Sequence, residues 1–277
     1  MTKKYKKKRK KYISKNMKIL AGVGIAAVII MVISVYSMLG KYNGLGIQKP
    51  IGENPYSIEN FSEINGEVFY EDDMYKGETV IDVSTYQRNV DFEKVKADGV
   101  SGVMIRLGYR GTEKGELCLD DRFRENIDKA VKADIKTGVY FFSQAVSTEE
   151  AIEEARFVIR NIRGKGVELP VAFDMEPVAG ADRIKGLTKR EKTEIADAFC
   201  QVIKRNGYEP VVYGNPTWLN NHIDMEYLTD YGVWLAHYTY FTDFNSRYCM
   251  WQYTDSGQVN GIEGNVDLNI YLTEREK

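Results

Sequence analysis

Histidine and cysteine are scarce in this sequence, which limits the chemistry that the chain can perform. The two histidines, His222 and His237, are too few for a metal site built on a histidine cluster. The three cysteines, Cys118, Cys200 and Cys249, are odd in number and far apart, so neither a disulfide framework nor a cysteine metal site is expected. Outside a cell, a disulfide between two of the three is one interpretation, and buried free thiols are an equally good one. We therefore expect no metal and no cofactor.

Acidic residues are absent from the first 18 residues, which carry nine Lys and one Arg. The rest of the chain holds all 40 acidic and 28 of the 38 basic residues, a net charge of −12. Such an acidic body is a poor candidate for binding nucleic acid, although it suits a neutral or mixed-charge polymer. The basic tail adjoins an apolar segment and is better explained as a signal for membrane topology.

Charged residues are also missing from residues 19–40, a run of 22 that is rich in Ile, Val, Ala, Met and Leu. As a helix this run would be about 33 Å long, enough to cross a bilayer core. A cleaved signal peptide, which would release a secreted form, is the alternative, but residues 36–40 offer only a poor cleavage site. We favour an uncleaved signal anchor in the cell membrane, spanning it once. The positive-inside rule then places residues 1–18 in the cytoplasm and everything after Lys41 outside the cell.

Residues 41–77 contain Gly, Pro, Asn and acids without regular periodicity, which predicts an extracellular spacer. Six aromatic residues in this segment indicate that part of it packs on the following domain, residues 78–277. The chain is 43% hydrophobic and 12% aromatic, a composition that suits one domain of barrel size.

From residue 78 onward, short apolar runs alternate with amphipathic ones. The pattern predicts strands at 79–83, 102–107, 137–142, 170–174, 209–213, 232–236, 248–253 and 265–268. It predicts helices at 91–97, 121–133, 148–163 and 188–206. Capping boxes, Ser147 with Glu150 and Thr188 with Glu191, mark two helix starts, and Gly207 is a natural stop for the last helix.

Repeated strand and helix units give parallel strands, because the crossovers between them are right-handed. Five such units followed by three closing strands predict an α/β fold, an irregular TIM-like (β/α)5(β)3 barrel behind an N-terminal transmembrane helix. An open doubly wound sheet would favour a Gly-rich phosphate turn after an early strand, and G-x-G-x-x-G follows neither Val83 nor Leu107.

The pattern Asp-x-Glu occurs at Asp91, Asp174 and Asp224, and only the middle copy follows a buried-strand pattern. Asp91 reads as the solvated start of a helix, and Asp224 as part of a surface loop or helical turn. Asp174 and Glu176 end the run that begins at Pro170, so their side chains should share one face at the end of a strand. Carboxylate chemistry is commonly placed at that end in a parallel barrel.

Two further acids are expected near this pair. Strand ends share one face of a barrel, and the first and last strands are neighbours when the barrel is closed. Asp82 lies near the end of the first predicted strand and Asp267 near the end of the last. Crowded carboxylates raise at least one pKa, and we expect Glu176 to be the protonated acid while Asp174 and Asp82 are ionised. A proton donor beside carboxylates that stabilise positive charge is the arrangement that cleavage of a glycosidic bond requires.

Aromatic side chains near the strand ends add candidates for sugar binding, and we expect fewer than half of them to touch a ligand. These candidates are Tyr109, Tyr140, Phe142, Tyr213, Trp234, Tyr238 and Trp251.

Several motifs lie in order between Val80 and Leu272. They are Ile81-Asp82-Val83-Ser84 with Gln87, Gly138-Val139-Tyr140-Phe141-Phe142, Phe173-Asp174-Met175-Glu176, Val212-Tyr213-Gly214-Asn215, Trp234-Leu235-Ala236-His237-Tyr238, Trp251-Gln252-Tyr253 and Gly264-Asn265-Val266-Asp267-Leu268-Asn269. Together these motifs resemble the glycoside hydrolase family 25 lysozymes. The resemblance implies cleavage of the β-1,4 bond between N-acetylmuramic acid and N-acetylglucosamine in peptidoglycan.

For the site, the resemblance implies that Glu176 is the general acid and that Asp174, Asp82 and Asp267 orient the substrate or stabilise the transition state. The motif around Trp251 adds Gln252 to the candidates for substrate binding. The family often has His where this sequence has Phe141. That departure alters either a subsite or a packing contact.

Three questions stay open at the level of sequence. Inversion, retention by a protein nucleophile and assistance by the substrate's 2-acetamido group are all compatible with two acids on one strand, and we favour the last, with Asp174 holding the acetamido group. A non-catalytic glycan-binding module on the same barrel is an alternative function. A metal-dependent phosphodiesterase is a weaker one, because such sites commonly recruit His. The expected partners are peptidoglycan strands and the membrane, and no motif indicates a protein partner.

Overall fold

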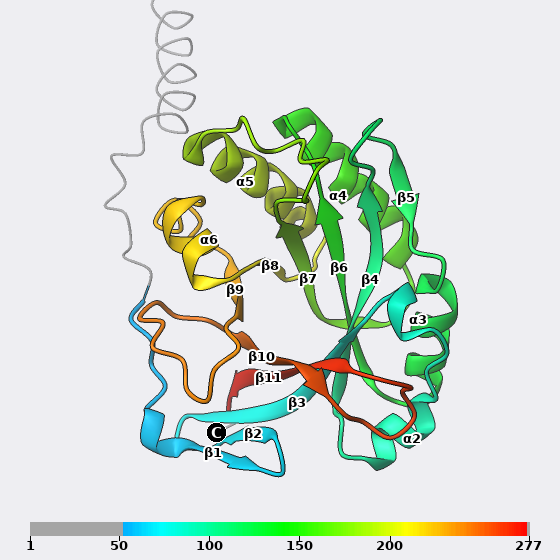
Figure 1. The fold of residues 1–277 in the computed structure, drawn as a ribbon, viewed down its shortest axis with the longest axis vertical. Coiled ribbons are helices and arrows are strands. Elements are labelled where there is room, and N and C mark those ends of the chain that lie inside the picture. The colour runs from blue at the N-terminus through cyan, green and yellow to red at the C-terminus, as the bar shows by residue number, and fades with distance from the viewer. Residues whose placement is uncertain (1–51, 276–277) are drawn as a thin grey trace, which may run out of the picture. The chain divides into compact units, whose positions relative to one another are not determined.

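The apolar runs of the sequence form a closed barrel of eight strands, which the computed structural model describes within residues 52–275 (Figure 1). The barrel strands are β3 (Tyr75–Val83), β4 (Gly102–Arg110), β6 (Lys136–Ser143), β7 (Val167–Met175), β8 (Pro210–Gly214), β9 (Gly232–Ala236), β10 (Met250–Gly257) and β11 (Val266–Glu274). They pair in the order β3, β11, β10, β9, β8, β7, β6, β4, and a pairing of β3 with β4 closes the ring. The α/β barrel that the sequence predicts is therefore present.

The last strand runs against the others, which corrects one detail of the prediction. The pairings from β3 through β4, β6, β7, β8 and β9 to β10 are parallel, whereas β11 is antiparallel to both β10 and β3. Asp267 was expected at the end of its strand, but it is the second residue of β11. Because β11 is reversed, its start lies at the mouth of the barrel where β3 ends, and Asp267 pairs in register with Asp82.

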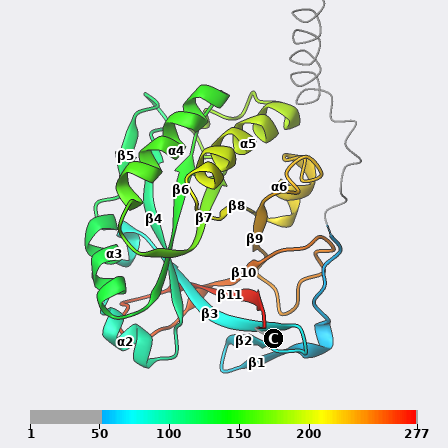
Figure 2. The same cartoon turned by 180° about the vertical axis from the view of Figure 1, so that it is seen from behind.

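Helices cover the outside of the barrel between the parallel strands (Figures 1 and 2). They are α2 (Phe92–Ala97), α3 (Phe123–Lys132), α4 (Thr148–Ile162), α5 (Lys189–Arg205) and the short α6 (Pro216–Asn221). The first four match the predicted helices to within two residues at each end, and α6 was not predicted.

The two predicted capping boxes differ in the structure. At α5 the box is complete, with Thr188 accepting from the Glu191 amide and Glu191 accepting from the Thr188 amide. At α4 only half of it forms: Ser147 accepts from the Glu150 amide, but the Glu150 carboxylate pairs with Arg183 at 2.9 Å. An ion pair with a residue distant in sequence thus replaces the local contact.

Strand alternation divides the core into two parts. Side chains of Val80, Met104, Ala172, Trp234 and Met250 form a cluster inside the barrel. Their neighbours in the strands pack outward against the helices in the larger cluster. Phe141 belongs to that outer layer, where it is fully buried against Phe157 of α4 at 6.1 Å between ring centroids. The departure from the family at Phe141 is therefore a packing contact rather than a change in the cleft.

Ahead of the barrel, residues 52–74 pack on its side, as the aromatic residues of this segment predict. They include the hairpin of β1 (Phe61–Ile64) and β2 (Glu67–Tyr70). Tyr56 is buried against Tyr70, Tyr75 and Tyr248, and its hydroxyl donates to the Tyr248 carbonyl at 2.8 Å. The part of the expected spacer that the structure describes is thus joined to the barrel.

The predicted cytoplasmic tail 1–18 and membrane anchor 19–40 lie outside the described residues. Among residues 52–275, no helix is both long enough and apolar enough to span a bilayer. All three cysteines fall within this range and are free thiols, with Cys200 fully buried and the other two half-buried.

Candidate active site

Four carboxyl groups meet at the mouth of the barrel where the parallel strands end. Asp82 at the end of β3 and Asp267 at the start of β11 are register partners, and their side chains are hydrogen-bonded. Asp174 is the penultimate residue of β7, and Glu176 follows the strand directly and is hydrogen-bonded to Asp174. The Asp-x-Glu copy that the strand pattern singled out therefore belongs to a group of four acids. These form two pairs, and the members of each pair affect one another's pKa.

Burial is the main cause of the pKa shifts of these acids. Burial and then the neighbouring Glu176 raise the pKa of Asp174 well above its usual range. Burial and then Asp267 do the same to the pKa of Asp82. Burial also raises the pKa of Glu176, although its hydrogen bond with Asp174 opposes that rise. Burial therefore opposes the expectation that Asp174 and Asp82 are ionised, because they are the two most deeply buried acids of the group.

A network of neutral side chains holds Asp82 in place. Its Oδ2 accepts from Gln252 Nε2 at 2.8 Å and from Asn269 Nδ2 at 2.9 Å. Gln252 Oε1 in turn accepts from the hydroxyls of Tyr213 at 2.9 Å and Tyr238 at 3.0 Å. Gln252 was predicted to bind substrate, but it is buried and touches Asp82 and the two tyrosines. Gln252 therefore orients the side chains that face the cleft.

The aromatic candidates separate into cleft residues and core residues. Tyr213 and Tyr238 line the cleft, and Tyr109 is an exposed residue at the end of β4. Tyr140 and Phe142 are half-buried on β6, and Phe142 is the register partner of Asp174. Burial and then Asp82 raise the pKa of Tyr140, which is consistent with a hydroxyl beside the acids.

Trp234 and Trp251 were predicted to bind substrate, and the structure corrects this prediction. Trp234 is 1% exposed, and Trp251 is fully buried. The Trp234 indole donates to Asn269 at 2.7 Å, and the Trp251 indole donates to the His237 carbonyl at 2.8 Å. Neither ring offers a face to a ligand. Trp234 instead supports Tyr213, whose ring centroid lies 4.8 Å away.

Three residues of the site were not identified from the sequence. Arg106 binds Asp120 at 2.8 Å, and its positive charge lowers the pKa of Asp174 in part. The sequence contains one signal for Arg106: it is a lone Arg in the apolar run of β4, two residues after Met104, which lies in the barrel interior. Asn269 and Trp218 gave weaker signals, since an amide in a strand and a tryptophan after a proline have many ordinary explanations.

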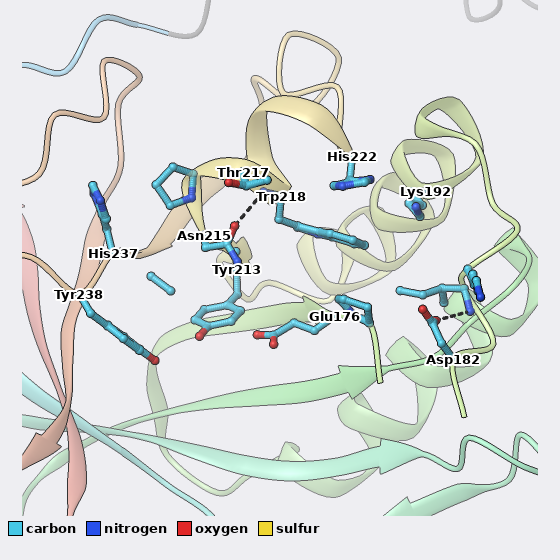
Figure 3. A pocket seen from close by; sticks show the side chains of 16 residues that line it. Glu176, Asp182, Lys192, Tyr213, Asn215, Thr217, Trp218, His222, His237 and Tyr238 are labelled. Atoms are coloured by element: carbon cyan, nitrogen blue, oxygen red, sulfur yellow. Dashed lines mark hydrogen bonds between the residues drawn. The ribbon is translucent and has the colours of Figure 1, made fainter. Parts of the chain in front are cut away.

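A cleft of about 960 Å³ opens beside Glu176 (Figure 3). Tyr213, His237 and Tyr238 lie on one side of Glu176, and Trp218, His222 and Lys192 gather near α5 and α6 on the other. His237 Nδ1 is 2.9 Å from the hydroxyl of Thr242. Within residues 52–275, no group of three or more His, Cys, Asp and Glu side chains is arranged to hold a metal ion. The cleft combines aromatic rings with side chains that can form hydrogen bonds, which is typical of a ligand-binding site.

Comparison with known proteins links this geometry to a family. The model of glycosyl hydrolases family 25 matches residues 81–262. The autolytic lysozyme of Clostridium acetobutylicum is 27% identical over 194 residues, 69% of this chain and 55% of that protein. The solved structure of the bacterial lysozyme from Streptomyces coelicolor is 26% identical with a TM-score of 0.59, covering 71% of this chain and 92% of that one.

The modular autolysin LytC from Streptococcus pneumoniae shares the fold, with a TM-score of 0.64 at 24% identity. The match covers 76% of this chain and 52% of LytC. The chain therefore matches about half the length of LytC and of the clostridial lysozyme.

Proposed function

This chain belongs to glycosyl hydrolases family 25, and from that premise we propose that it hydrolyses peptidoglycan at the β-1,4 bond between N-acetylmuramic acid and N-acetylglucosamine. The observation that carries the proposal is the position of Glu176 in the wall of the cleft, directly beside the buried Asp174. A proton donor next to a second carboxyl group is the minimal equipment for breaking a glycosidic bond. The lysozymes among the relatives support the choice of substrate.

We assign the role of general acid to Glu176. Its carboxyl group points into the cleft near Tyr213 (Figure 3). Burial raises its pKa, so the group retains its proton closer to neutral pH than an exposed Glu does. In the reaction the Glu176 carboxyl gives this proton to the glycosidic oxygen as the bond to the sugar carbon breaks.

We assign to Asp174 the task of holding the substrate's 2-acetamido group. Asp174 Oδ1 is buried and has no hydrogen-bond partner among the described residues, so it is an acceptor suited to an amide N–H. The acetamido oxygen then attacks the anomeric carbon, and water later opens the cyclic intermediate. An N–H bound to Asp174 favours its ionised form, which leaves the proton of the pair on Glu176. The pair of Asp82 and Asp267 orients the substrate or stabilises the positive charge that develops in the transition state.

Loss of turbidity of a purified peptidoglycan suspension tests the proposal. Glu176→Gln should lower the rate of turbidity loss by a factor of about 10² to 10⁴, the usual contribution of a general acid. Glu168→Gln is the matched control, because Glu168 lies on β7 but is exposed near the start of the strand. An inactive wild type would favour the alternative of a non-catalytic glycan-binding module.

We also propose that the enzyme acts while tethered to the cell membrane. The support is in the sequence: a basic segment, residues 1–18, precedes the uncharged apolar run 19–40. From this order we predict that the barrel lies outside the cell, where peptidoglycan lies.

A further inference from the structure

The cleft contains a region that the proposed hydrolysis does not use. Beyond Glu176, toward α5 and α6, it is lined by Trp218, His222 and Lys192 (Figure 3). None of these residues belongs to the four acids or to the network around Gln252. We refer to these three residues as the α5/α6 pocket.

Lys192 is the unusual member of the α5/α6 pocket. It lies in the first turn of α5, and only 6% of its surface is exposed. A lysine so deeply buried is normally paired with an acid, because removing an ammonium group from water is costly. Within residues 52–275, however, the ammonium group of Lys192 forms neither an ion pair nor a hydrogen bond. Its Nζ lies over the ring of Trp218, 5.1 Å from the centroid.

The surroundings of Lys192 are electropositive. Its position in the first turn of α5 adds the positive end of the helix dipole. Burial, and then the positive charges of Lys192 and Lys189, lower the pKa of His222, whose ring stacks on Trp218 at 4.8 Å between centroids. Of the acids that line the cleft, Asp182 accepts from the Ile184 amide, and Glu176 is paired with Asp174. Neither of them neutralises Lys192.

A buried cation without a counterion, facing a cleft in an acidic protein, is suited to an anion supplied by the ligand. Resting on the proposed function, we propose that the α5/α6 pocket binds an anionic substituent of the wall polymer, a carboxylate or phosphate group, through Lys192. Trp218 provides an apolar wall beside that group. Binding of this substituent places the glycan next to Glu176 and gives the enzyme a preference for charged strands over neutral ones.

Lys192→Met tests this inference, because Met keeps an unbranched side chain that is only one atom shorter and removes the charge. The full-length protein is assayed at low ionic strength on three peptidoglycan preparations. The first is freed of phosphate polymers but keeps its peptide carboxylates. The second is the same material with the carboxylates converted to methylamides, and the third keeps its phosphate polymers but has its carboxylates amidated.

We expect Lys192→Met to lower kcat/KM about 10-fold or more on the first or the third preparation and to leave the second unchanged. A loss on the first identifies a carboxylate, and a loss on the third identifies a phosphate. Lys192→Arg should retain most of the preference for charged strands over neutral ones. Arg190→Met is the control, because Arg190 is an exposed residue of the same helix end, pairs with Glu194 and does not line the cleft.

Two results would overturn the inference. One is an equal loss on all three preparations, which would mean that Lys192 supports only the structure. The other is no loss on any of them. Failure of the proposed function itself is distinguishable, because the wild type would then be inactive on all three.

Discussion

Gln252 connects the acids on β3 and β11 with the tyrosines that face the cleft. Its amide group donates to Asp82 and accepts from both Tyr213 and Tyr238, so one side chain fixes the orientation of three others. Because it is buried, each of these bonds is costly to lose. The network gives the cleft a fixed shape before substrate arrives.

Gln252→Leu should therefore lower kcat/KM by about 10- to 100-fold with little change in fold. Leu keeps the approximate volume but removes both hydrogen-bonding groups, which frees the two tyrosine rings and leaves Asp82 with Asn269. Steady-state kinetics on soluble peptidoglycan fragments measures the effect. Gln258→Leu, at an exposed position on the neighbouring loop, should be close to wild type. Equal activity of both variants would contradict a positioning role for Gln252.

The role given to Asp174 predicts the stereochemistry of the reaction. Attack by the substrate's acetamido group followed by attack of water inverts the anomeric carbon twice, so the first product keeps the β configuration. NMR of the anomeric proton, recorded before mutarotation, measures this directly. A first product of α configuration would rule out the acetamido route and would favour Asp174 as a base that activates water.

Sequence patterns located the acids better than the aromatic residues. Asp174 and Glu176 stood out because an apolar strand ends at them, and strand geometry alone brings them together. Trp234 and Trp251 were misassigned because a tryptophan near a strand end looks the same in sequence whether it faces the cleft or the core. Asn269 was missed for a related reason: its value comes from partners on β3 and β9 that are distant in sequence.

Helix α4 is held to the barrel by a buried charged contact. Arg110 at the end of β4 is 3% exposed and binds Glu154 at 2.7 Å, and Ser143 donates to the other oxygen of Glu154 at 2.7 Å. Burial raises the pKa of Glu154 to about 7, despite the opposing effect of Arg110. Ionisation of Glu154 is therefore less favourable in the folded protein than in the unfolded chain.

This contact predicts a pH dependence of stability. An exposed Glu titrates near 4.5, so the folded protein binds more protons than the unfolded chain between that pH and about 7. The stabilising contribution of Glu154 is complete below pH 4.5 and is lost as the pH rises through 7, at a cost of about 3 kcal/mol. Denaturant unfolding at several pH values should show this slope in the wild type.

In Glu154→Gln the slope should be smaller, because the amide does not titrate. Glu153→Gln is the matched control, since Glu153 is a half-exposed neighbour on α4 that also binds Arg110. If the wild type and Glu154→Gln lose stability in parallel with rising pH, the buried contact is not the cause.

Strands and helices with strong periodicity were predictable, and irregular elements were not. All eight barrel strands and α2 to α5 lie where the apolar pattern places them. The hairpin of β1 and β2, the short β5 (Leu117–Leu119) and α6 were missed, because each is short and carries little periodic signal. The direction of β11 was also beyond the pattern, since alternation is the same in a parallel and an antiparallel strand.

For the protein as a whole, the account predicts attachment to the membrane. Full-length protein should sediment with membranes and remain there after washing with high salt, which removes proteins held only by charge. A variant that lacks residues 1–40 should be soluble. Protease added outside intact protoplasts should degrade the barrel. Release of the full-length protein by salt would contradict an apolar anchor.

The central claim is that Glu176 drives cleavage at N-acetylmuramic acid, and analysis of new reducing ends tests it most directly. Purified peptidoglycan is digested with the full-length protein, reduced with borohydride and examined by mass spectrometry. The account predicts reduced N-acetylmuramic acid at the new ends. With Glu176→Gln its amount should fall by a factor of about 10² to 10⁴. New ends at N-acetylglucosamine, or undiminished cleavage by Glu176→Gln, would contradict the account.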